Sequence, residues 1–145
     1  NRGAGFSLDP NSSNVVGPKK RPFHTIIPGF LLRNGQPIMS FGVMGGPMQA
    51  QGHVQLVLRT ELWGQDPQTA IDAPRWRFDE GKRVAVEISM PKKTISILSD
   101  MGHDVEFENY DKNFGFGGAQ IIKNLGNNFF IAGSDPRKDG QSVGI

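Results

Sequence analysis

The sequence has 145 residues, enough for one domain with a hydrophobic core, and its 37% hydrophobic and 21% charged residues are typical of a globular chain. Its 16 basic and 14 acidic residues leave a formal charge of +2. Apart from Lys19-Lys20-Arg21 the basic residues are dispersed, which argues against a nucleic-acid-binding face. The chain has no cysteine, which excludes disulfides and thiolate metal sites, and no apolar run approaches the ~18 residues of a membrane span.

The N-terminal part combines a loop region with a hairpin. Residues 1–22 are rich in Gly, Asn, Ser and Pro and are predicted to form a loop region within a single domain. Strands are predicted at 25–33 and 36–43, because Asn34-Gly35 between them is the signature of a tight hairpin. Pro28 inside the first strand indicates an edge position, a bulge or an irregular start.

Two helices are predicted next. The first covers 47–63, with Gly64 at the position of a C-cap, and its apolar residues at helical spacing are Val54, Val57, Leu58 and Leu62. Asp66-Pro67 then predicts an N-cap followed by proline at the first position of a short helix, which ends before Pro74.

The remaining pattern is mostly extended. The predicted elements are a strand at 84–89, a helix at 91–101, a strand at 104–108, and two hairpin strands at 118–124 and 129–133. The helix at 91–101 is expected to turn Ile95, Leu98 and Met101 inward. The order β-β-α-α-β-α-β-β-β predicts an α+β fold, in which hairpins form an antiparallel sheet with helices packed on a face.

The most informative segment joins the strand ending at Val43 to the helix beginning at Pro47. Gly45-Gly46 lie at this junction, which places unobstructed backbone N–H groups at the positive end of a helix dipole. Such a junction binds an anion, or the oxyanion that forms when an amide or ester is attacked. A strand-glycine-helix junction is also compatible with plain packing.

No other segment carries a catalytic signature. His24, His53 and His103 show no ligand spacing and are interpreted as surface or packing residues, so neither a metal site nor a cofactor is predicted. The chain lacks both the phosphate-binding loop pattern and the Gly-x-Ser-x-Gly elbow. The residues by themselves therefore indicate an anion or oxyanion cradle without a nucleophile. They leave open an enzyme and a non-enzymatic anion-binding or structural module.

Four segments in the same order and with similar spacing resemble the C-terminal part of the γ-glutamyltranspeptidase family. They are Gly17-Pro18-Lys19-Lys20-Arg21-Pro22, the Gly45-Gly46 junction, Asp72-Ala73-Pro74-Arg75 and Ser134-Asp135-Pro136-Arg137. The resemblance extends over essentially all 145 residues.

This resemblance implies an N-terminal-nucleophile hydrolase with a four-layer αββα sandwich. In that family a precursor cuts itself, and the new N-terminal threonine attacks a γ-glutamyl donor such as glutathione, with its own α-amine as the base. The acyl group then passes to water or to an acceptor amine. The resemblance assigns Gly45 and Gly46 as donors to the oxyanion.

The substrate-binding positions depart from the family pattern. The family's paired serines after Lys-Arg-Pro-Leu, which hold the substrate carboxylate, correspond to His24 and Thr25. The segment that grips the substrate amino group corresponds to residues 1–5, where Gly5 replaces the acid and Arg2 favours an anion. These departures indicate a divergent branch whose acyl substrate is a dicarboxylic or other acid group rather than glutathione.

The family's nucleophile has no counterpart in this chain. Thr25 does not follow a plausible processing site and is not interpreted as the nucleophile. The resemblance places the nucleophilic threonine before Asn1. The missing initial methionine indicates a processed or shortened polypeptide. The partners expected are the large subunit and the N-terminal part of the small subunit from the same precursor. We expect this chain to be inactive alone and, with an unpaired apolar sheet edge, to dimerise or to fold only with its partner.

Overall fold

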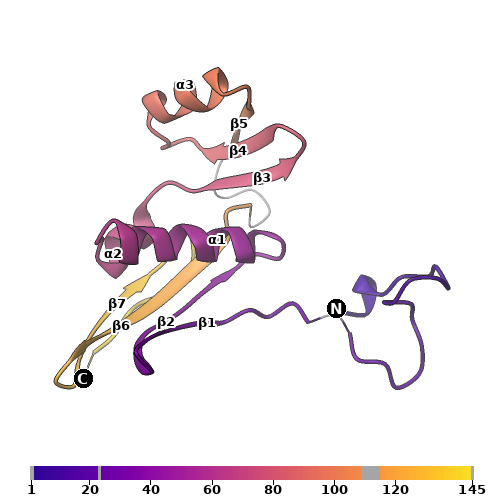
Figure 1. The fold of residues 1–145 in the computed structure, drawn as a ribbon, viewed down its shortest axis with the longest axis horizontal. Helices are drawn as coiled ribbons and strands as arrows, with labels where there is room; N and C mark the ends of the chain where they lie inside the picture. The colour runs from indigo at the N-terminus through magenta and orange to yellow at the C-terminus, as the bar shows by residue number, and fades with distance from the viewer. Residues whose placement is uncertain (1, 23, 109–114, 145) are drawn as a thin grey trace.

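The computed structural model describes residues 2–22, 24–108 and 115–144. Its strands form two sheets, with two of the helices between the sheets and a third beyond the smaller sheet (Figure 1). The elements in chain order are η1 (Arg2–Gly5), β1 (Gly29–Arg33), β2 (Gln36–Met44), α1 (Met48–Val57), η2 (Leu58–Leu62), α2 (Pro67–Asp72), β3 (Trp76–Glu80), β4 (Arg83–Glu87), α3 (Lys92–Asp100), β5 (Asp104–Glu108), β6 (Gly118–Gly126) and β7 (Phe129–Ser134). The α+β class predicted from the sequence is confirmed.

The larger sheet is antiparallel and has four strands in the order β1-β2-β6-β7. Both predicted hairpins form. Asn34 and Gly35 have φ values of 52° and 77°, and Asn127 and Asn128 have 51° and 63°, so both turns use the left-handed conformation that suits tight hairpins. β1 is an edge strand and begins directly after Pro28, in agreement with the expected edge position.

The main core lies between this sheet and the helices. The sheet contributes Met39, Val43, Ala119 and Ile121, α1 contributes Leu56, and α2 contributes Ile71. α1 and α2 lie along the same side of the sheet (Figure 1). The helix layer therefore covers one face of the sheet and positions the β2–α1 junction at the end of the core.

The long predicted helix is divided into two parts. α1 ends at Val57 and continues as the π-helical turn η2, in which the Trp63 N–H donates to the Leu58 carbonyl at 3.0 Å. Val54, Leu58 and Leu62 lie on the exposed face, whereas Leu56 is buried against the sheet. Of the four apolar residues whose spacing predicted the helix, Val57 packs against the core and the other three form an outer stripe.

The second sheet has the order β3-β4-β5, with β4 and β5 parallel and connected through α3. β3 was not predicted: Trp76 and Phe78 alternate with Arg77 and Asp79, but two apolar residues among five are a short signal. Ile95 and Leu98 of α3 pack inward as predicted.

One residue of this unit was assigned to the wrong environment. Met101 is exposed, so its predicted inward position is wrong: α3 ends at Asp100, and the chain turns away through Met101 before Gly102, which has a φ of 89°. Within the described ranges, none of the helices has the length and apolar character needed to cross a bilayer.

Candidate functional site

The β2–α1 junction presents two backbone donors beside the start of a helix. Gly45 and Gly46 have φ values of 145° and 61°, conformations that residues with a Cβ rarely adopt. Their carbonyls accept from the N–H groups of Met48 at 3.3 Å and Gln49 at 3.1 Å. In the described part of the chain, the N–H groups of Gly45 and Gly46 donate to no other residue. This leaves them available at the positive end of α1.

The two glycines are required for different reasons. A Cβ on Gly45 would lie 2.9 Å from the Cα of Gly117, and a Cβ on Gly117 would lie 2.3 Å from the Met44 carbonyl oxygen. The backbones of the junction and of the segment before β6 therefore touch. A Cβ on Gly46 would meet nothing within 4 Å, so only its backbone conformation favours glycine.

Gln49 connects the junction to the segment before β1. Its Nε2 donates to the carbonyls of Thr25 at 2.6 Å and Gly46 at 3.2 Å, and its Oε1 accepts from the Ile27 N–H at 3.3 Å. The Thr25 hydroxyl oxygen is buried and has no hydrogen-bond partner among the described residues. Two predicted site residues, Thr25 and Gly46, are thus joined through a residue that sequence reasoning missed. Its only signal was a glutamine in the first turn of α1.

Of the other predicted substrate-binding residues, Arg2 and Gly5 lie away from the junction, and His24, next to Thr25, makes no hydrogen bond to it among the described contacts. Gly5 and the backbone of Arg2 belong to η1, in the N-terminal segment that projects away from the two sheets (Figure 1). The hydrogen bonds described for residues 2–22 stay within that segment, as in the one from Asn14 Nδ2 to the Gly5 carbonyl at 2.7 Å. His24 is exposed. The roles of Arg2, Gly5 and His24 stay predictions.

The Asp-Ala-Pro-Arg and Ser-Asp-Pro-Arg motifs meet in a buried group of charges, here called the ion cluster: Arg75, Glu87, Asp135 and Arg137. Arg75 Nη2 lies 2.6 Å from Asp135 Oδ2, and these two side chains are almost fully buried. Arg137 binds Glu87 through Nε at 2.5 Å and Nη2 at 2.6 Å, and Asp135 through Nη1 at 3.2 Å. The sequence singled out both motifs but not their contact.

Burial and charge act against each other in this cluster. Burial opposes ionisation of Asp135, but the charge of Arg75 and the N–H groups of Ala119 and Arg137 outweigh it, so the pKa of Asp135 is lowered. Burial also disfavours the charged form of Arg137, yet its contacts with Glu87 and Asp135 raise its pKa. The favoured state of Asp135 and Arg137 is therefore a buried pair of opposite charges.

The ion cluster fixes the backbone that touches the glycine junction. Arg75 Nη1 donates to the Phe116 carbonyl at 2.9 Å, and Asp135 Oδ2 accepts from the Ala119 N–H at 2.6 Å. These two contacts bracket Gly117, the residue that packs against Gly45. The cluster thereby positions one wall of the junction.

A cavity of about 430 Å³ opens beside Gly45, and its lining includes the polar residues Gln51, Arg77, Asp79 and Arg83. Arg77 pairs with Asp79 at 2.6 Å and with Glu108 at 3.0 Å, and these carboxylates hold the pKa of the Arg77 guanidinium above its usual range. No group of three or more His, Asp or Glu residues in the described part of the chain is arranged to hold a metal ion.

His53 supports the strand that leads into the junction. Its Nε2 accepts from the Val43 N–H at 3.0 Å, and its ring lies 5.0 Å from that of Phe41. Burial lowers the pKa of His53, which favours the neutral form that can accept this bond. This packing role agrees with the interpretation drawn from the sequence.

Comparison with known proteins places these features in a family. The profile of the family described as gamma-glutamyltranspeptidase matches residues 1–145. A glutathione hydrolase-like proenzyme of Bacillus subtilis is 40% identical over 151 residues, 100% of this chain and 28% of the relative. An oxamate amidohydrolase proenzyme of Klebsiella pneumoniae is 34% identical over 99% of this chain and 28% of the relative. The chain thus spans little more than a quarter of either protein.

Solved structures show the same similarity. The crystal structure of a cephalosporin acylase from Bacillus halodurans has a TM-score of 0.87 and 48% identity, over 97% of this chain and 26% of that one. A gamma-glutamyltranspeptidase from Pseudomonas nitroreducens has a TM-score of 0.79 at 20% identity, over 93% of this chain and 69% of that one, and so shows the shared fold.

Proposed function

This chain belongs to the gamma-glutamyltranspeptidase family, and on that premise we propose that it is the C-terminal part of an amidohydrolase or acyltransferase precursor. It spans 28% of each of the two curated relatives described above, which are proenzymes. Its small-molecule substrate would be an amide, and its nucleophilic threonine would lie in the preceding part of the same polypeptide. The isolated 145-residue chain would then be inactive.

The observation that supports this proposal is the pair of N–H groups at Gly45 and Gly46, which have no hydrogen-bond acceptor among the described residues. Fixed backbone donors stabilise an oxyanion most effectively when they need no rearrangement during the reaction. Gly117 and Gln49 hold the junction from two sides, which provides that rigidity. The junction therefore acts as the oxyanion-binding part of the active site.

The proposed reaction has two steps of acyl transfer. The threonine hydroxyl oxygen attacks the amide carbon while its proton passes to the α-amine of the same residue. The carbonyl oxygen becomes an oxyanion that accepts from the N–H groups of Gly45 and Gly46. Collapse breaks the C–N bond, and the leaving amine takes the proton. Water or an acceptor amine then cleaves the ester and restores the hydroxyl.

We propose a substrate acyl group that carries a carboxylate without requiring a neighbouring amino group. Thr25 keeps a hydroxyl at the position that resembles the carboxylate-binding serines, and its buried oxygen has no described partner. Gly5 supplies no counter-charge for an amino group. Two relatives are named for other acyl compounds, oxamate and cephalosporin, which supports a substrate range beyond glutathione.

The open face of the four-stranded sheet supports the proposal that the preceding part of the precursor packs against this chain. Phe30, Ser40, Ile122 and Ala132 form one row across the strands, on the side opposite the buried core. Phe30 and Ile122 are exposed in this row, although residues 142–144 of the C-terminal tail lie beside part of it. A second sheet packed on this face would complete the αββα sandwich.

The test compares two glycines of similar backbone conformation in the enzyme that contains its preceding part. Gly46→Val should lower kcat by about 10²–10³ because it displaces an oxyanion donor. Gly35→Val is the matched control: Gly35 also has a positive φ, and a Cβ added there would meet no atom within 4 Å, but it lies in the β1–β2 hairpin. The turnover of this control should stay near that of the parent enzyme.

Steady-state kinetics with a γ-glutamyl anilide, oxamate and a glutaryl amide would give kcat and the substrate class together. Unchanged turnover in Gly46→Val would refute the oxyanion assignment. Equal losses in both variants would mean that general strain, not a lost donor, causes the effect. A protein without turnover on any amide would favour the non-enzymatic anion-binding module.

A further inference from the structure

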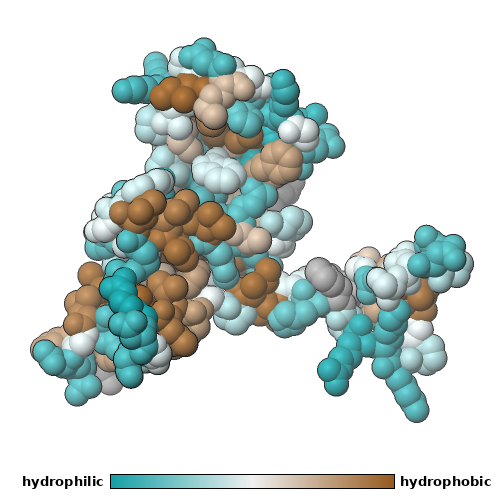
Figure 2. All heavy atoms as spheres, in the orientation of Figure 1, coloured by the Kyte–Doolittle hydropathy of each residue, from teal (hydrophilic) through white to brown (hydrophobic). Residues whose placement is uncertain are grey.

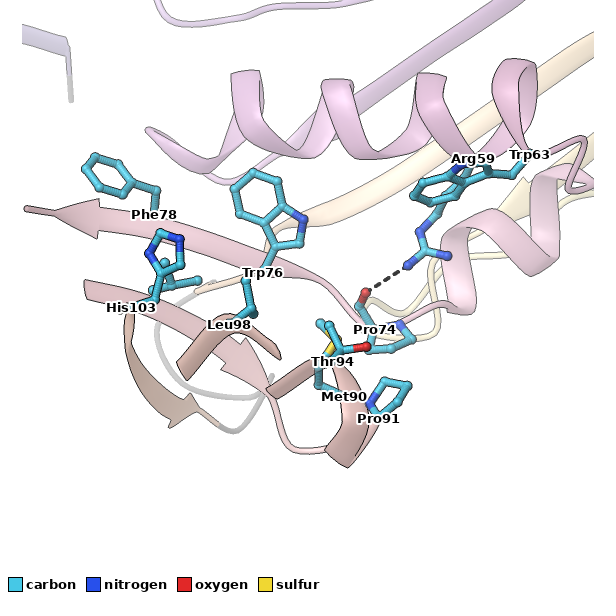
Figure 3. A pocket seen from close by; sticks show the side chains of 11 residues that line it. Arg59, Trp63, Pro74, Trp76, Phe78, Met90, Pro91, Thr94, Leu98 and His103 are labelled. Carbon is cyan, nitrogen blue, oxygen red and sulfur yellow. Dashed lines mark hydrogen bonds between the residues drawn. The ribbon is translucent and has the colours of Figure 1, made fainter. Parts of the chain in front are cut away.

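A second cavity, of about 580 Å³, lies between η2, β3 and α3 (Figure 3). Phe78 lines both this cavity and the one beside Gly45. We refer to it as the aromatic groove, and its lining residues are Arg59, Trp63, Pro74, Trp76, Phe78, Val84, Met90, Pro91, Thr94, Leu98 and His103. It contains both tryptophans of the chain. No step of the proposed reaction uses this groove.

Arg59 is a cation without a carboxylate partner in the described part of the chain. Its Nη2 donates to the Pro74 carbonyl at 3.2 Å and its Nη1 to Gln65 Oε1 at 3.3 Å, while its guanidinium lies 5.5 Å from the centre of the Trp63 ring. Burial and the nearby charges of Arg75 and Arg137 lower the pKa of Arg59. An added carboxylate would relieve this excess positive charge.

The walls of the groove are too apolar for a surface that faces water. Trp63, Trp76 and Phe78 are 57%, 38% and 47% exposed, although each carries an aromatic ring. The exposed Leu58 and Leu62 of η2 extend this surface along the helix, where Figure 2 shows apolar side chains gathered over α1 and η2. Contiguous exposed apolar surface of this kind marks an interaction site.

We propose that the aromatic groove docks a segment from the preceding part of the same precursor, which inserts an apolar side chain beside Trp63 and Trp76 and places a carboxylate against Arg59. This inference rests on the proposed function, because it requires that preceding part to exist. It adds a contact on the helix side of the molecule, opposite the open sheet face.

Two observations favour this occupant over a free small molecule. The chain spans only 28% of its curated relatives, so a large covalently linked partner is available to cover the surface. The exposed apolar surface also continues past the groove onto Leu58 and Leu62, which a small aromatic acid inside the groove would leave uncovered. A polypeptide segment can cover both.

Photo-crosslinking in the full precursor tests the proposal directly. p-Benzoylphenylalanine at Trp63 should crosslink to one segment before Asn1, identified by mass spectrometry. The same probe at Met101, which is more exposed than Trp63 and does not line the groove, is the control for random collision and should give at least a tenfold lower yield. Crosslinks to a second copy, or none above the control, would overturn the proposal.

The charge is tested in the same crosslinking assay. Arg59→Glu should reduce the Trp63 crosslink about tenfold because it repels the docked carboxylate, whereas Arg59→Lys should retain it. Lys92→Glu changes an exposed cation outside the groove and should have no effect. An undiminished crosslink in folded Arg59→Glu would exclude the carboxylate contact.

Different results would refute the docking inference and the proposed function. If the precursor turns over an amide but Trp63 gives no crosslink to its preceding part, only the docking inference fails. If no preceding part is encoded, the proposed function fails first. Saturable binding of 3-phenylpropionate to the assembled enzyme, detected by quenching of Trp63 and Trp76 fluorescence, would show that a small molecule occupies the groove instead.

Discussion

His53 links a helix to the strand that leads into the glycine junction through a single side chain. Its Nε2 must be unprotonated to accept from the Val43 N–H, and burial keeps its folded-state pKa below 6.5. The unfolded chain, with an ordinary histidine pKa, then binds more protons between these two values. The stabilisation is complete above about pH 6.5 and is lost as the pH falls through the folded-state pKa.

We therefore predict that the stability advantage of the parent protein over His53→Gln depends on pH. The difference in free energy of unfolding should be constant above about pH 6.5 and should shrink below it, because glutamine does not titrate in this range. Denaturant unfolding of both proteins at several pH values measures this difference. A difference that stays constant down to about pH 4 would contradict the assigned role of His53.

At the scale of elements, the ion cluster joins the segment after α2 to the ends of β4 and β7. Arg137 is 6% exposed and donates to the carbonyls of Ile71 and Ala73 as well as to Glu87. These contacts connect chain segments far apart in the sequence. The cluster therefore holds the helix layer and both sheets in one arrangement around Gly117.

Removing one member of a buried ion pair leaves the other charge without compensation. Arg137→Ala should lower the free energy of unfolding by about 3–5 kcal/mol, because Glu87 stays buried. Arg33→Ala is the matched control: its side chain is 68% exposed in the pair with Glu61, and its loss should cost about 0–1 kcal/mol. Chemical denaturation of both variants compares them, and equal costs would argue against the importance of burial here.

At the scale of the whole molecule, the open sheet face and the edge strand β1 leave apolar surface and backbone groups unpaired. Exposed surface of this kind promotes association. We predict that the isolated chain dimerises through this surface or folds only with the preceding part of the precursor. Light scattering and far-UV circular dichroism measure this, and a folded, monodisperse monomer would contradict the prediction.

Much of the fold could be predicted because its signals are local. Asn34-Gly35 and Asn127-Asn128 specify their turns through the left-handed conformation, and Asp66 caps α2 by accepting from the Thr69 N–H at 3.0 Å. β3 could not be predicted in this way. Arg77 pairs with Asp79 inside the strand and also with Glu108 of β5, a partner that lies 31 residues further along the chain.

The candidate site likewise combines residues that a local sequence pattern identifies with contacts that only the structure shows. Gly45 and Gly46 were identified from the sequence, because a strand followed by two glycines and a proline is a local pattern. The link from Gln49 to Thr25 spans 24 residues, and no local rule selects that pair. Arg2 and Gly5 were aligned by resemblance to the family, and the structure does not bring them to the junction.

By itself, the sequence determined the two hairpins, the helix starts, the glycine junction and membership of the family, because each depends on residues close together in the chain or on a recognisable motif. The tertiary structure alone decided which distant groups meet: Arg75 with Asp135, Gly45 with Gly117, and Trp63 with Trp76 in the aromatic groove. The physical reason is that burial, desolvation and close backbone approach depend on the packing of whole elements.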